Sequence, residues 1–152
     1  MFNAITHSSI FVLDQDEALD FYVGKLGLEV GADVDMGFMR WLTVRVPGEP
    51  GREILLEKAP PHWLDEATGE QVRDLVTKGA MGLGFILTTD DCRGTYEQLK
   101  AKGVEFTDEP TEHFYGIDCG VRDPFGNNLR ITQPAAQPSE PQPGEFAPAR
   151  GS

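Results

Sequence analysis

Short apolar stretches, separated by charged residues and glycines, divide this chain into alternating strands and helices. The stretch from Ile5 to Leu13 has the apolar, β-branched character of a strand. Asp14 follows it as a predicted helix N-cap, with Glu17 three residues later as in a capping box. Gly27 is typical of the residue that ends a helix. The helix between them would bury one apolar face made of Ala18, Phe21, Tyr22, Val23 and Leu26.

The same order of elements occurs twice. After the first helix, the pattern predicts strands over residues 28–30, 38–46 and 53–57, with a turn at 47–51. In the second half it predicts a strand over 83–89, a helix from the cap Asp90 to Lys102, and strands over 104–106, 113–121 and 128–132. The step from helix cap to closing glycine is thirteen residues in both halves (27 − 14 = 103 − 90). Such self-similarity indicates a duplicated unit.

A duplicated βαβββ unit predicts an α+β fold in which each helix covers one face of its own strands. The opposite faces would then form a curved mixed sheet around a central cavity. We place the two halves at about residues 1–58 and 83–133. The connector, residues 59–82, would hold a short helix from about Glu70 to Lys78 and is a candidate lid or dimer contact.

Composition limits the classes of partner. Residues 134–152 are Pro-rich and nearly free of large apolar side chains, so we expect a disordered tail after a domain of residues 1–133. The net charge of −12 disfavours nucleic-acid binding, because phosphate contacts need clustered lysines and arginines. An acidic excess of this kind favours a solvated surface, or a cavity that attracts cations.

The N-terminal apolar run and the cysteines indicate a cytoplasmic protein. The run from Ser9 to Leu13 is short and is followed at once by acidic residues, which argues against a signal peptide and a membrane span. Cys92 and Cys119 are too few for a disulfide framework and lack the paired spacing of a zinc site. A reducing compartment is therefore expected.

Several short motifs together resemble those of the vicinal oxygen chelate superfamily, which contains glyoxalases, bleomycin-resistance proteins and ring-cleaving dioxygenases. The motifs are His7 followed by Asp14, Phe21-Tyr22, Leu26-Gly27-Leu28, Lys102-Gly103-Val104 and Asp123-Pro-Phe-Gly-Asn127. The resemblance spans residues 5–133 and implies the fold described above. It does not imply one activity, because this scaffold hosts many.

The resemblance also suggests where a metal would bind. Metal-using members place one ligand on the first strand of each half and others on the last strands, each a His, Glu or Gln. By position, His7 matches the first-half ligand, Gly84 the second-half ligand and Arg130 the last-strand ligand. The fourth position falls within residues 53–57, where the candidates are Ile54, which the alignment favours, and Glu53 and Glu57. Glycine has no side chain and a guanidinium has no acceptor atom, so we expect no bound metal and no other cofactor.

Strand alternation predicts which side chains face the cavity. His7, Ser9 and Phe11 share one face of the first strand; Gly84, Ile86 and Thr88 share a face in the second half, as do Asn128, Arg130 and Thr132. Alternation does not decide which face of its strand Trp41 occupies. The predicted ligand pocket consists of His7, Ser9, Phe11, Trp41, Glu57, Ile86, Tyr115, Asn128 and Arg130.

Two of these residues have alternative roles. Arg130 needs a counter-charge, because an uncompensated buried charge costs about 3–5 kcal/mol. It would pair with a carboxylate such as Glu57 or Asp118, or hold an anionic or carbonyl group of a ligand. His7 would hydrogen-bond only to its neighbours, or act as a general base or polar anchor in the pocket.

These observations lead to one functional hypothesis and one alternative. The hypothesis is a metal-free homodimer that binds a small organic molecule, as bleomycin-resistance-type members do. Its partners would include neither nucleic acid nor a membrane. The alternative is a metal-dependent lyase, isomerase or dioxygenase that uses His7 and a glutamate of residues 53–57.

Overall fold

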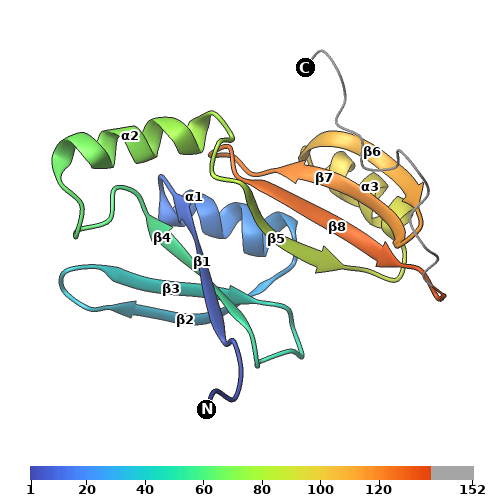
Figure 1. Ribbon diagram of the computed structural model, residues 1–152, viewed down its shortest axis with the longest axis horizontal. Coiled ribbons are helices and arrows are strands. Elements are labelled where there is room, and N and C mark those ends of the chain that lie inside the picture. Colours follow the sequence, from blue (N-terminus) through green and yellow to red (C-terminus); the bar gives the residue numbers. More distant parts are fainter. Residues whose placement is uncertain (138–152) are drawn as a thin grey trace.

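The computed structural model describes residues 1–137, so the tail expected beyond them lies outside the described residues. These residues form two four-stranded sheets that lie side by side (Figure 1). The strand order of the first sheet is β1 (His7–Val12), β4 (Glu53–Lys58), β3 (Arg40–Arg45) and β2 (Glu29–Asp35). That of the second is β5 (Leu83–Thr88), β8 (Asn128–Pro134), β7 (Gly116–Arg122) and β6 (Glu105–His113). In each sheet the first pair is parallel and the others are antiparallel, so the predicted α+β fold of tandem βαβββ units is confirmed.

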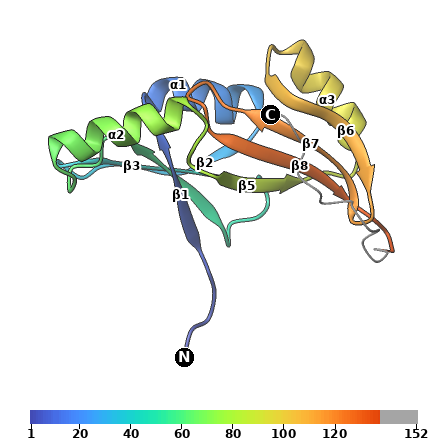
Figure 2. The same ribbon diagram turned by 45° about the horizontal axis from the view of Figure 1, so that its top comes forward.

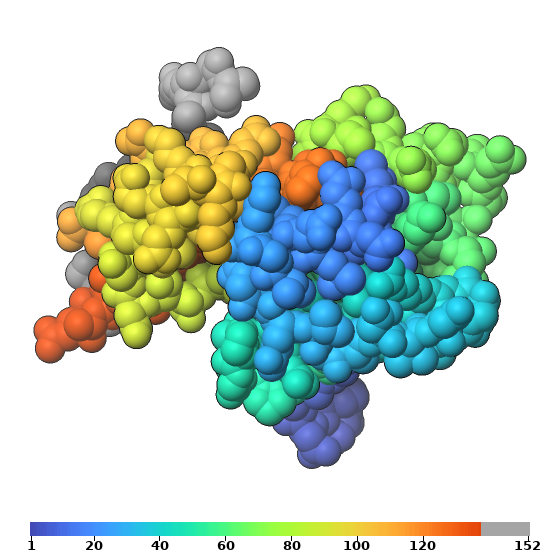
Figure 3. Space-filling model, turned by 180° about the vertical axis from the view of Figure 1, so that it is seen from behind, coloured from blue at the N-terminus to red at the C-terminus, as the bar shows by residue number. Residues whose placement is uncertain are grey.

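Helices cover one side of the two sheets and leave the other side open (Figure 2). The first helical segment is α1 (Gln15–Leu19), which continues directly into the π-helix η1 (Asp20–Lys25). The others are α2 (Glu66–Thr77) in the connector and α3 (Cys92–Ala101) in the second half. Figure 3 shows the covered side, with residues of α1 in blue at the centre and those of α3 in yellow to their left. No helix within residues 1–137 is long and apolar enough to cross a membrane.

The core lies between the helices and the sheets. Alternation turns every second side chain of a strand toward the helices. Ile10 and Val12 of β1 are therefore buried, as are Leu129 and Ile131 of β8, whereas their neighbours along each strand are more exposed. Removing these side chains from water is the main force that holds the helices against the sheets.

The helix caps explain how the two halves correspond. The Asp14 carboxylate accepts a hydrogen bond from a backbone N–H of α1 at 2.8 Å, as the sequence predicts. In the second half the cap is Asp91 and not the predicted Asp90; its carboxylate accepts a backbone N–H of α3 at 2.9 Å. Gly84 then precedes its cap by the same seven residues as His7 (91 − 84 = 14 − 7). The correction therefore supports the correspondence of His7 with Gly84.

Three predicted elements have different bounds in the structure. The connector helix begins at residue 66, capped by Asp65, because that carboxylate accepts the Thr68 N–H at 2.8 Å. The strand predicted over 28–30 extends to residue 35 as β2. His113 ends β6 and does not begin the next strand, so Phe114 and Tyr115 form the hairpin turn before β7. Polar residues dominate β6, which is why an apolar pattern did not reveal its length.

A buried polar network joins the two halves. The hydroxyl of Tyr22, in η1, donates to Asp123 Oδ2 at 2.7 Å. Asp123 Oδ1 accepts the backbone N–H groups of residues 125, 126 and 127. The Asn127 amide donates both to Asp123 and to the Phe11 carbonyl in β1, at 2.8 and 2.7 Å. The Asp-Pro-Phe-Gly-Asn turn, which the sequence explains only locally, thus connects the second half to the first.

Candidate functional site

The open face of the first sheet carries a histidine paired with a glutamate. His7 Nε2 lies 3.2 Å from Glu53 Oε2, because the parallel register of β1 and β4 places the two residues side by side. Thr43 of β3 donates its hydroxyl to the other oxygen of Glu53 at 2.7 Å. The ring of Trp41 lies 6.0 Å from that of His7, centroid to centroid. The Trp41 side chain therefore lies on the open face, which the sequence alone did not decide.

The register of β1 with β4 also shows which residue of 53–57 lies beside His7. Ile54 packs against the core, whereas Glu53 contacts His7 on the open face. Leu55 pairs with Thr43 and is 8 % exposed beneath that face. Alternation then places Glu57 on the same side, next to Phe11. The preference for Ile54 as the β4 position beside His7 was wrong, because it rested on an alignment that did not include the pairing of β1 with β4.

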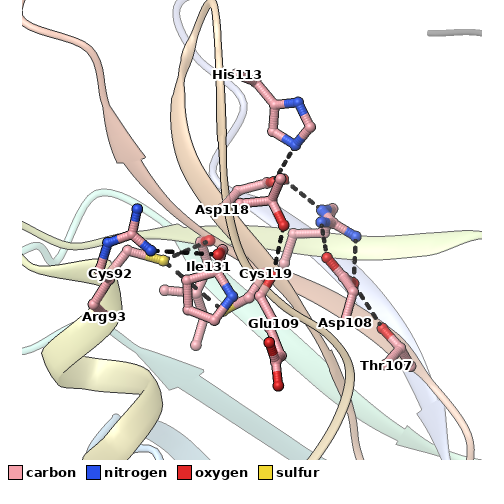
Figure 4. Close-up of polar contacts among 12 residues, drawn as sticks. Cys92, Arg93, Thr107, Asp108, Glu109, His113, Asp118, Cys119 and Ile131 are labelled. Carbon is pink, nitrogen blue, oxygen red and sulfur yellow. Dashed lines mark hydrogen bonds and ion pairs between the residues drawn. The ribbon is translucent and has the colours of Figure 1, made fainter. Parts of the chain in front are cut away.

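The open face of the second sheet is organised around Arg130, whose carboxylate partners Asp118 and Asp108 are labelled in Figure 4. Its Nε donates to Asp118 Oδ2 at 2.6 Å. Its two terminal nitrogens donate to the two oxygens of Asp108, at 3.3 and 3.0 Å. These hydrogen bonds, foremost the one that Arg130 donates to Asp118, raise the pKa of the guanidinium further above its usual value. Gly120 lies opposite Arg130 on β7, and a side chain there would collide with the Asp108 carboxylate and crowd the guanidinium.

The pairing settles one alternative that the sequence left open. Asp118, one of the two carboxylates expected, is the partner of Arg130 and is only 2 % exposed. Asp108 was not foreseen as a partner, since its strand β6 was predicted to end at residue 106. Glu57, the other expected partner, lies on the other sheet and makes no ion pair with Arg130 among the described residues.

Two ring side chains extend this cluster. His113 Nε2 lies 3.3 Å from Asp118 Oδ1. The rings of His113 and Tyr115 are stacked, with centroids 5.1 Å apart and planes 12° apart. Burial, together with the charge and hydrogen bond of Asp118, raises the pKa of Tyr115 to about 12. Figure 4 shows His113 and Asp108 on either side of Asp118, so one buried carboxylate orders the whole group.

The residues present do not fit the divalent metal of the metal-using members. His7 and Glu53 provide two donors on the first sheet, but the corresponding positions of the second half hold Gly84 and Arg130. A catalytic zinc has three protein ligands with lone pairs, and a guanidinium has none to give. Within residues 1–137, no group of three or more His, Cys, Asp or Glu side chains could hold a metal ion.

Of the nine predicted pocket residues, His7 and Ile86 line one cleft between β1 and β5, and the other seven do not line it. His7, Ser9, Phe11, Trp41 and Glu57 belong to the first sheet; Ile86, Tyr115, Asn128 and Arg130 belong to the second sheet or its hairpin. Asn128 has a structural role, because its amide donates to the Gly79 carbonyl and accepts from Arg122. The sequence analysis missed Thr43 and His113, whose contacts depend on strand register, and Asp108. The pocket as a whole remains a prediction.

Comparison with known proteins agrees with the fold and the motifs. The family model described as "Glyoxalase/Bleomycin resistance protein/Dioxygenase superfamily" matches residues 4–131. The chain belongs to this superfamily. Protein YurT of Bacillus subtilis (strain 168), described as uncharacterized, is 38 % identical over 130 residues, which are 85 % of this chain and 98 % of YurT.

Solved structures show the same fold. The crystal structure of UcmS2 is 41 % identical in sequence, with a TM-score of 0.82 over 87 % of this chain and 98 % of that chain. TnmS3, described as an antibiotic binding protein from Streptomyces sp. CB03234, is 28 % identical, with a TM-score of 0.70 over 88 % of this chain and 98 % of that one. A superfamily member from Sphaerobacter thermophilus DSM 20745 is 30 % identical, with a TM-score of 0.71 over 87 % and 98 % of the two chains.

Proposed function

We propose that this protein binds a small organic molecule without a metal ion and without altering it. The observation that carries the proposal is Arg130 fixed between Asp118 and Asp108, at a position where metal-using relatives keep a metal ligand. A permanent positive charge there repels a divalent cation. Gly84, the second-half position that corresponds to His7, has no side chain that could bind a metal. The second half therefore lacks the ligands needed to complete a metal site that includes His7.

The ion pairs also indicate the charge that a ligand would carry. Arg130 is shared by two carboxylates, so its charge is already balanced within the protein. Arg130 with Asp108 and Asp118 brings one positive and two negative charges, which favours a neutral or cationic ligand over an anionic one. This preference agrees with the acidic net charge of −12.

Two further features support the proposal. The open faces present aromatic and aliphatic side chains beside a few polar groups, which is the usual character of a small-molecule site. Ile86, on β5, is 53 % exposed, and the Trp41 ring lies beside His7. TnmS3, which shares the fold at 28 % identity, is described as an antibiotic binding protein.

We also propose that the functional unit is a homodimer in the cytoplasm. Apolar side chains such as Val34 and Ile86 are more than half exposed on the open faces, and a second copy would cover them. Sedimentation equilibrium would give twice the chain mass of 16.7 kDa. A monomer at all concentrations up to the millimolar range contradicts this part of the proposal.

A thermal-shift screen tests ligand binding. The panel would contain metal-free bleomycin and structurally diverse antibiotics, added to protein treated with chelator. We expect at least one compound to raise the melting temperature, and Trp41→Ala to remove that shift because the ring lies on the open face. Trp63→Ala is the matched control, since Trp63 is 63 % exposed in the connection between β4 and α2. The proposal fails if no compound stabilises the protein, or if both variants keep the full shift.

A further inference from the structure

A cleft of about 490 Å³ opens between β1 and β5, with its floor on the helix-covered side of the first sheet, beyond the end of η1. Its floor is a row across three strands, made of Ser8, Ile54 and Val44, which the strand register places side by side. Phe85 and Leu87 of β5 form the facing wall. In Figure 1 this region lies between β5, the beginning of β1 and the turn that joins β3 to β4. It is therefore at the junction of the two halves.

The floor of the cleft lies on the other side of the first sheet from Trp41, whereas its rim includes His7, Glu53, Ile86 and Thr88 of the open face. Neighbouring residues of a strand point to opposite sides of the sheet. Ser8 lines the cleft, whereas Ser9 lies on the side of the open face. Both serines are exposed. A ligand seated on this floor would thus lie mainly on the other side of β1 from Trp41 and would meet His7 at the rim.

Two arginines, Arg45 and Arg52, lie at the mouth of the cleft. Arg45 forms an ion pair with Glu29, to which it donates at 3.0 Å. Arg52 lies in the turn between β3 and β4, is exposed, and makes no ion pair within residues 1–137. A guanidinium on apolar walls suits a ligand with an apolar body and a carboxylate or sulfonate at one end.

We propose that this cleft is a second binding site, for an amphipathic aromatic acid. The aromatic body would lie on Ile54 and against Phe85, and the acidic group would accept hydrogen bonds from Arg52. The volume is within the range of about 300–1,000 Å³ that holds drug-sized ligands. Two glutamates also line the cleft: Glu53 is paired with His7 and Thr43, whereas Glu49 weakens the attraction by its like charge, so Glu49→Gln should strengthen binding. This site goes beyond the proposed function and does not depend on it.

Two matched probes test whether the cleft prefers a ligand with an acidic group. 8-Anilinonaphthalene-1-sulfonate and N-phenyl-1-naphthylamine share one aromatic body, and only the first carries an acidic group. Fluorescence titration of the full chain should give a dissociation constant about fivefold lower for the sulfonate, which corresponds to one charge-assisted contact. Arg52→Ala should remove this difference by weakening the sulfonate alone. Lys102→Ala removes an equal charge from the end of α3, away from the cleft, and should change neither constant.

Two matched substitutions test whether the probes bind in the cleft. Ser8→Trp fills the cleft and should reduce binding of both probes at least tenfold. Ser9→Trp adds the same bulk on the other side of β1 and should leave both constants within twofold. Thermal melting of each variant verifies that it is folded.

The proposal is overturned if Ser8→Trp leaves probe binding unchanged, if Arg52→Ala affects both probes equally, or if neither probe binds. None of these outcomes touches the proposed function, because that function is measured with antibiotics and Trp41→Ala on the open face.

Discussion

Removing the hydroxyl of Tyr22 tests whether one buried carboxylate joins the two halves of the fold. Tyr22 is fully buried, and its hydroxyl donates to Asp123 Oδ2 at 2.7 Å across 101 residues of sequence. A hydrogen bond to a charged group contributes about 1.5–3 kcal/mol. Asp123 Oδ2 keeps a second donor in the Asn127 amide, so Tyr22→Phe should lower the free energy of unfolding by about 2 kcal/mol.

The assay is urea denaturation followed by circular dichroism, with thermal melting as a second measure. For a chain of this length, about 2 kcal/mol corresponds to a fall in melting temperature of about 4–8 °C. Tyr96→Phe is the matched control, since Tyr96 is also buried but its hydroxyl contacts only Lys100, at 3.3 Å. The reasoning is refuted if the two variants lose equal stability.

Three further substitutions or reactions follow from named contacts. Asp118→Asn leaves Arg130 with one carboxylate and should cost about 1–3 kcal/mol in urea denaturation; an unchanged midpoint would show that the pair contributes nothing. Gly126→Ala should destabilise the protein by at least ~2 kcal/mol, because Gly126 has φ +112 and a Cβ there would collide with a carbonyl of α2; wild-type stability would contradict this. Burial raises the pKa of Cys119 to about 12 and that of Cys92 above its usual value, so both thiols stay protonated at pH 8. They should not react with Ellman's reagent until guanidinium unfolds the chain, and rapid reaction of the native protein would disprove the assigned burial.

Much of the fold was accessible from the sequence because it depends on local rules. The N-cap Asp14 and the closing Gly27 have a local physical signature, and the structure has both. Alternation separated Ile10 and Val12 of the core from their neighbours on the open face. The duplicated order of elements predicted the tandem βαβββ units, although not the strand order of the two sheets.

The site was less accessible because its contacts join residues that are distant in sequence. Glu53 meets His7 only through the register of β1 with β4, and Asp108 meets Arg130 only through two successive strand pairings. Sequence alternation fixes the face of a residue but not its neighbour across the sheet. The polar strand β6 has no apolar period, so its length and its contribution of Asp108 were missed. Asp118 was found because Arg130 required a counter-charge.

Metal titration of the unmodified protein tests the central claim most directly. Protein purified without a nickel column and treated with chelator would be titrated calorimetrically with Zn²⁺, Ni²⁺ and Mn²⁺. With Arg130 and Gly84 at two ligand positions, the account predicts no stoichiometric binding at micromolar protein concentration. Tight binding of one ion per chain that His7→Ala abolishes would contradict it.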